Sequence, residues 1–195
     1  MWPWEHLAFG YVIYSLTARA AWRRSPGGVE AVAVVLATQL PDLIDKPLSW
    51  GLGVFPAGYA MGHSIVVAVP LSAAVIALAH RRERVADGLA FAVGYLSHLA
   101  GDLLSPLLSE GRLAFERVLW PFVSLPPYET TRGFAGRFLL YVGRYAHEAM
   151  EPENWPLLVA YLGLFVAVGV LWMLDGAPGV RELVVALRAS ARERS

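Results

Sequence analysis

The segment GYLSHLAGDLLSP, residues 94–106, places a histidine and an aspartate four positions apart in an otherwise apolar run. Side chains at positions i and i+4 lie on one face of a helix, about one turn apart, so His98 and Asp102 can point at one metal ion. Ionisable side chains are costly at membrane depth, where they usually mark a functional site. For this pair alone, the alternative is a hydrogen bond that merely satisfies two buried groups.

Two further ligands can complete a metal site around this pair. His63 opens an apolar run, and either Asp42 or Asp45 in the segment PDLID supplies a carboxylate. The plainer alternatives are a histidine at a helix N-terminus and an aspartate that solvates a helix end at Pro41. Imidazoles and carboxylates suit zinc, and also manganese or iron, with geometry deciding among them. A shared site explains these residues together better than separate roles do.

Two outlying groups extend the prediction. His6 can reach a second ion with Asp102 as a bridge, and an interfacial histidine is the alternative. His147 and Glu151 repeat the i, i+4 spacing, but the segment HEAMEPE also has the composition of a solvated amphipathic helix. We therefore predict one to three divalent ions, with zinc favoured. The full set of candidate ligands is His6, Asp42, Asp45, His63, His98, Asp102, His147 and Glu151.

Composition places this chemistry in a membrane. The chain has 195 residues, of which 56% are hydrophobic and 16% are charged, whereas soluble domains have about 25% charged residues. A net charge of zero gives no overall basic surface for nucleic acid, so we expect no nucleic acid partner. The apolar composition leads us to expect membrane lipids as partners. The absence of cysteine excludes disulfides and thiolate metal sites.

The apolar runs predict an all-α integral membrane bundle that forms a single domain over residues 1–195. We expect about five transmembrane helices, although several runs are shorter than the ~20 residues of a straight crossing, so four plus an interfacial helix is the alternative. Between them we expect a loop or short re-entrant piece at 46–62, an interfacial segment at 105–155 with an amphipathic helix near 136–150, and a basic tail at 175–195. The predicted helices are 4–22, 29–40 (ending at Pro41), 63–80 (with a kink at Pro70), 85–104 and 156–174.

The arginines predict the orientation of this bundle. Ten of the sixteen basic residues fall at one end of the predicted helices, which the positive-inside rule places in the cytoplasm together with the tail. Alternating five helices then gathers six of the candidate ligands and the 105–155 segment at the opposite, non-cytoplasmic side of the plasma membrane. The ten are arginines 19, 23, 24, 81, 82, 84, 181, 188, 192 and 194.

These motifs together resemble a known family. An early histidine, PDxxD, a GHS histidine, GYLSHxxxDxLSP and LWP at 119–121 are similar to the YdjM-like family of membrane-bound metal-dependent hydrolases. That family is in turn similar to the zinc-dependent phospholipase C and single-strand nuclease superfamily. The motifs cover roughly residues 1–121. Where the family often has HRGxTHS, this chain has GYAMGHS, so Gly58 and Tyr59 replace a histidine and an arginine.

The resemblance implies a ligand set and an activity. By this resemblance, one zinc is held by Asp42 or Asp45 with His63, His98 and Asp102. His6 matches an N-terminal zinc site that shares the aspartate, and His147 with Glu151 could match an HxxxE pair. The implied function is hydrolysis of a phosphoester or ester bond in a lipid or lipid-linked substrate by metal-activated water, with Asp42 or Asp45 as general base. Arginines 132, 137 and 144 are candidates for holding phosphate.

Two other functions are compatible with the same residues. A non-catalytic metal-binding or transport protein would carry polar residues through the membrane, and the middles of helices 63–80 and 156–174 are almost free of them. A structural or interaction protein would use the polar cluster only to stabilise the bundle. This last alternative predicts that the purified protein contains no metal.

Overall fold

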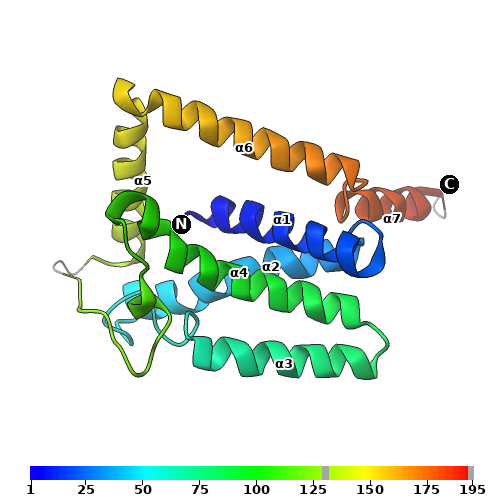
Figure 1. Cartoon of the computed structure of the whole chain (residues 1–195), viewed down its shortest axis with the longest axis horizontal. Helices are drawn as coiled ribbons and strands as arrows, with labels where there is room; N and C mark the ends of the chain where they lie inside the picture. Colours follow the sequence, from blue (N-terminus) through cyan, green and yellow to red (C-terminus); the bar gives the residue numbers. More distant parts are fainter. Residues whose placement is uncertain (129–131, 193–195) are drawn as a thin grey trace.

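The computed structural model describes residues 1–128 and 132–192, and within them it contains seven α-helices and no strand (Figure 1). This confirms the all-α class. Arg194, the last arginine of the predicted basic tail, lies outside the described residues.

Four helices form a bundle around α4. They are α1 (Pro3–Trp22), α2 (Gly28–Lys46), α3 (Ile65–Arg81) and α4 (Val85–Glu110), and α4 packs against each of the other three (Figure 1). The buried residues between them are mostly small, and alanines dominate. Small residues let helix backbones approach closely, which is how helices associate where lipid removes the hydrophobic drive.

Gly94 shows how close that approach is. A Cβ atom at this position of α4 would lie 2.9 Å from Cβ of Ala37 and 3.0 Å from the carbonyl oxygen of Val34, both on α2. Because only glycine fits such a backbone contact, this position sets the spacing between α2 and α4. These two helices carry four of the candidate ligands.

The remaining helices surround one side and one end of the bundle. α5 (Phe134–Met150) lies across the end where the chain begins, and α6 (Trp155–Leu174) runs back beside α1 (Figure 1). α7 (Val180–Arg192) forms the tail at the opposite end, where the turn between α3 and α4 also lies. A π-helical turn at Pro47–Gly51 and 3-10 turns at Phe115–Arg117 and Pro152–Asn154 complete the described elements.

Asp175 holds α6 against α1. Its carboxylate accepts hydrogen bonds from the hydroxyls of Tyr11 (2.8 Å) and Ser15 (2.7 Å) and pairs with Arg19. Asp175 follows α6 directly, and all three partners lie on α1. The side chains of α6 itself are largely exposed, so this polar contact fixes one end of an otherwise loosely attached helix.

Two predicted helix ends are wrong. The helix at 29–40 does not stop at Pro41 but continues to Lys46, because a proline inside a helix removes one hydrogen bond and bends the helix without necessarily ending it. The helix at 85–104 likewise continues through Pro106 to Glu110. Asp42 and Asp45 therefore lie in the last turn of α2 rather than in a loop.

The described residues contain one clear candidate for a membrane span. Pro152–Leu174 is 23 residues long and includes an 18-residue stretch with a mean hydropathy of 2.5, and Ile65–Arg81 is apolar but shorter. The other bundle helices carry ionisable residues that lower their hydropathy. A bundle of five spans therefore remains a prediction.

Candidate metal centre

Six of the eight candidate ligands meet in one buried cluster. His6 lies in the first turns of α1, Asp42 and Asp45 in the last turn of α2, and His63 in the loop before α3. His98 and Asp102 project from α4, and all six side chains are buried. The elements that carry them come from separate parts of the chain. The cluster lies at the end of the bundle opposite the turn between α3 and α4, which carries Arg81, Arg82 and Arg84, as the helix order predicted. Their role as ligands stays a prediction.

The centre of the cluster is a pair of imidazole nitrogens. Nε2 of His63 and Nε2 of His98 are 3.1 Å apart. Oδ2 of Asp102 lies 3.4 Å from the first and 3.3 Å from the second. Oδ1 of Asp42 lies 3.3 Å from Nε2 of His63 and 3.8 Å from Nε2 of His98. The two nitrogens and two carboxylate oxygens thus bring four donor atoms to one point.

Asp45 orients His63 instead of facing the centre. Its Oδ2 accepts from Nδ1 of His63 (2.8 Å) and from the backbone N–H of Ala60 (2.7 Å) and His63 (3.0 Å), and Oδ1 accepts from the N–H of Gly62 (2.9 Å). Both oxygens are occupied, so we revise its predicted role as ligand or general base to that of an orienting carboxylate. Such carboxylates fix the tautomer of metal-binding histidines and raise their basicity.

His98 is oriented in the same way by a backbone oxygen. Its Nδ1 lies 2.6 Å from the carbonyl oxygen of Thr38 on α2. With Nδ1–H as the donor, Nε2 carries the lone pair and faces the cluster centre. The two histidines therefore present their Nε2 atoms to the same point because their Nδ1 atoms are both held from behind.

The loop that carries His63 is fastened from two sides. The hydroxyl of Tyr95 on α4 donates to the carbonyl of Gly62 (2.7 Å), and the hydroxyl of Ser64 donates to the carbonyl of Trp120 (2.5 Å). A Cβ at position 62 would lie 2.8 Å from the carbonyl oxygen of Pro41, so the loop can reach α2 only with glycine there. The LWP segment at 119–121 thus supports the histidine loop.

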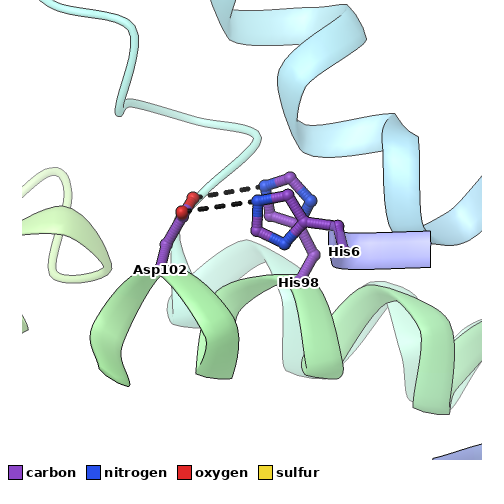
Figure 2. A group of neighbouring side chains, drawn as sticks. All are labelled: His6, His98 and Asp102. Carbon is purple, nitrogen blue, oxygen red and sulfur yellow. Dashed lines mark ion pairs between the residues drawn. The ribbon is translucent and has the colours of Figure 1, made fainter. Parts of the chain in front are cut away.

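His6 and Asp102 form a second group on the other side of His98. Figure 2 shows both histidines directed at the carboxylate of Asp102, with the two imidazole rings face to face. The rings are stacked with centroids 3.6 Å apart, and Nε2 of His6 lies 3.4 Å from Oδ1 of Asp102. Oδ1 also accepts from the amino group of Met1 (2.9 Å). Asp102 therefore turns one oxygen to each group, as a bridging carboxylate would.

The donor set fits a divalent cation. Two ligands bound to one zinc at about 2.0–2.1 Å lie roughly 3.3 Å apart at the tetrahedral angle, close to the separations around the nitrogens of His63 and His98. Both ring nitrogens of His6 are buried without a hydrogen-bond partner. Within the described residues, two sets have donor atoms close enough to hold an ion: His6, His98 and Asp102, and Asp42, His63 and His98.

The buried carboxylates of the cluster also favour the binding of a positive charge among them. Asp42, Asp45 and Asp102 are all buried, and Lys46 pairs with Asp42. Burial by itself lowers the pKa of His63, but its hydrogen bonds to these three carboxylates outweigh that effect and raise the pKa to about 10. These carboxylates therefore favour a positive charge at His63, and a divalent ion bound at Nε2 would supply that charge in place of a proton, since metal and proton compete for the same lone pair.

The remaining predicted residues lie apart from this cluster. Nε2 of His147 and Oε1 of Glu151 are 3.7 Å apart, but both side chains are exposed on or beside α5 and belong to neither set. Arg137 is buried with its guanidinium stacked on the ring of Tyr128, 3.7 Å from the centroid, and Arg132 and Arg144 are exposed.

Two further residues lie beside the cluster, and sequence reasoning assigned neither of them a role there. The ring of Tyr59 meets that of His63 edge-on with centroids 4.8 Å apart, and the guanidinium of Arg117 lies 5.2 Å from the centre of the Tyr59 ring. Nothing in the spacing of an isolated tyrosine and an interfacial arginine signals this placement. At Gly58, where the resembling family often has histidine, the hydroxyl of Tyr128 accepts from the backbone N–H (3.1 Å).

Comparison with known families bears on the whole arrangement. The family model described as YdjM inner membrane protein matches residues 1–175. The chain belongs to the YdjM inner membrane protein family. Membrane localisation follows from this membership. The YdjM match ends at Asp175, so it includes the bundle, α5 and α6 and leaves out α7. No curated protein and no solved structure matches the chain.

Proposed function

We propose that this YdjM-family protein is a membrane-bound metal-dependent hydrolase of phosphoester or ester bonds. The observation that carries the proposal is the convergence of Nε2 of His63, Nε2 of His98 and oxygens of Asp42 and Asp102 at the spacing of ligands on one ion. A divalent ion bound there would activate water near neutral pH and polarise the bond under attack.

Different residues of the chain would bind that ion, orient its ligands and accept a proton. His63, His98 and Asp102 would hold it, with Asp45 and the Thr38 carbonyl keeping the two imidazoles in register. Asp42, whose other oxygen pairs with Lys46, would either complete the coordination or accept the proton of the water. His6, whose two ring nitrogens are buried without a hydrogen bond and whose Nε2 lies 3.4 Å from Oδ1 of Asp102, would hold a second ion.

The location of the cluster supports a lipid or lipid-linked substrate. The cluster lies at the end of the bundle crossed by α5, an amphipathic helix with exposed Phe138 and Leu139. The arginines of the α3–α4 turn mark the opposite end, so the positive-inside rule would direct the cluster to the non-cytoplasmic interface. Substrates that reside in that leaflet would reach it without leaving the membrane.

Metal analysis of the purified protein tests this proposal. We expect stoichiometric zinc or manganese in the detergent-purified protein, lost in His98→Ala and in Asp102→Ala. His80→Ala is the matched control, because His80 lies at the far end of α3 beside the arginine cluster and its removal should leave the metal content unchanged.

Hydrolysis assays follow on the same samples. Phospholipids and generic phosphodiesters should be cleaved by the metal-loaded protein and not by the two depleted variants. If the protein binds no metal even after reconstitution, the hydrolase proposal is wrong and the buried cluster has a structural role.

A further inference from the structure

Arg117 lies beside the cluster and, among the described residues, forms no ion pair with a carboxylate. It lies in a 3-10 turn after α4, and its Nη1 donates to the carbonyl oxygen of Asp102 (3.2 Å) and to Oγ of Ser105 (3.4 Å). Among the described residues, both of its hydrogen bonds use Nη1 and both acceptors are neutral. An arginine has five N–H donors, so Nε and Nη2 keep theirs available.

The bond to Asp102 has a local cause. Position 106 of α4 is proline, which has no N–H, so the carbonyl of Asp102 four residues earlier loses its helical partner. Nη1 of Arg117 takes the place of that N–H. The guanidinium is thereby fixed at the one residue whose carboxylate serves both groups of the cluster.

Tyr59 fixes the other side of the guanidinium. The charge lies over the Tyr59 ring, 5.2 Å from its centroid, and the same ring contacts His63. Stacking of this kind holds the planar guanidinium fork in one orientation. Arg117 is thus attached to two neighbours of the ion-binding atoms, Asp102 and His63, by independent contacts.

Charge decides what this fork can recognise. The cluster contains three buried carboxylates, and Lys46 is already paired with one of them. A neutral ester would gain little from a second cation at the site. An anionic substrate would be repelled by those carboxylates, and a second cation would offset that repulsion. A fork of parallel N–H donors matches the geometry of phosphoryl oxygens.

We propose that Arg117, oriented by Tyr59, binds a phosphoryl oxygen of the substrate and makes this site specific for phosphoesters. The inference rests on the proposed hydrolase function and narrows its substrate to phosphate esters. Arg117 would contact the non-bridging oxygen that the ion does not hold, and Tyr59 acts as a positioning residue.

Phosphate binding to the metal-loaded, detergent-solubilised protein provides the test, with inorganic phosphate as the probe in calorimetric titrations. Arg117→Gln should weaken phosphate binding roughly 10-fold or more, because a charge-assisted bidentate contact is lost. Arg117→Lys should recover part of the affinity. Arg112→Gln is the matched control: it removes the same charge five residues away, from an exposed arginine paired with Glu110 and Glu116.

Metal content, measured on every sample, separates the possible failures. Unchanged metal with weaker phosphate binding only at Arg117 supports the inference. Unchanged metal with equal phosphate affinity in Arg117→Gln and the parent protein overturns it and leaves the hydrolase proposal standing. Absence of metal from the parent protein overturns both.

The source of the phosphate needs a second pair of probes. Mixed micelles containing phosphatidate present the group on a lipid, and glycerol 3-phosphate presents it in water. Where binding of inorganic phosphate depends on Arg117, dependence with the micelles but not with glycerol 3-phosphate assigns the site to a lipid headgroup, and dependence with both assigns it to the phosphate group itself. Dependence with neither contradicts the inference.

Discussion

Asp45 and His63 show how a backbone loop and one carboxylate place a metal-binding nitrogen. Asp45 accepts four hydrogen bonds, three from the loop backbone and one from the ring it orients. The same interactions that fold the loop therefore select the tautomer of His63. A substitution of this carboxylate should therefore disorder the loop and lower the metal affinity together.

Asp45→Asn tests this coupling. An amide has one acceptor oxygen where Asp45 uses two, so at least one N–H loses its partner and the ring of His63 loses its orientation. We expect metal affinity to fall roughly 10- to 100-fold, as for other residues that orient metal ligands. Competition with a chelating dye measures it.

Asp87→Asn is a suitable control for that substitution, because Asp87 pairs with Arg84 at the opposite end of the bundle. A variant Asp45→Asn that binds metal as tightly as Asp87→Asn would show that the carboxylate does not act through His63.

The sequence predicted the identity of these residues better than their roles. Spacing alone brought His98 and Asp102 together, because i and i+4 share a helix face whatever the fold. It could not choose between Asp42 and Asp45, since the choice depends on α2 continuing through Pro41 and turning the two carboxylates in different directions. Arg117 was missed because its position depends on a carbonyl freed by a proline in another element.

At the scale of elements, the spacing between α2 and α4 determines whether Asp42 can face His98. That spacing depends on Gly94, where the backbones meet. Bulk at this position should therefore affect metal binding although the residue touches no ligand.

Gly94→Ala should separate the two helices. The added Cβ would press on the backbone of α2, and overpacking of this kind costs about 1–3 kcal/mol. We expect a lower thermal midpoint together with reduced metal content, measured by thermal unfolding in detergent and by elemental analysis.

Gly163→Ala on α6 adds the same methyl group where nothing lies within 4 Å. It should leave metal content unchanged and stability unchanged or slightly higher, because alanine favours a helix over glycine. Equal behaviour of the two variants would mean that the α2–α4 contact does not control the cluster.

At the scale of the whole molecule, the arginine-rich turn between α3 and α4 and the cluster lie at opposite ends. The sequence predicted this separation from the arginines and the helix order. Hydropathy is a weaker guide here, because the ionisable residues that build the cluster also lower the hydropathy of the helices that carry them, and a single segment passes as a clear span among the described residues.

Thiol labelling in intact cells tests the orientation. The chain has no cysteine, so Glu83→Cys in the α3–α4 turn and Ser124→Cys after the LWP segment each introduce a single thiol. In cells whose outer membrane is permeabilised and whose inner membrane is intact, a membrane-impermeant maleimide should label position 124. It should label position 83 only after the cells are lysed. The reverse pattern would place the cluster on the cytoplasmic side.

The contact between Asp175 and α1 has a consequence for the time course of synthesis. Tyr11 and Ser15 emerge from the ribosome 164 and 160 residues before the carboxylate that they bind. Until then these hydroxyls and Arg19 lack their carboxylate partner and have to be satisfied by water or lipid headgroups. The polar contact that fixes α6 against α1 can therefore form only late in synthesis, and a chain that stops before residue 175 lacks it.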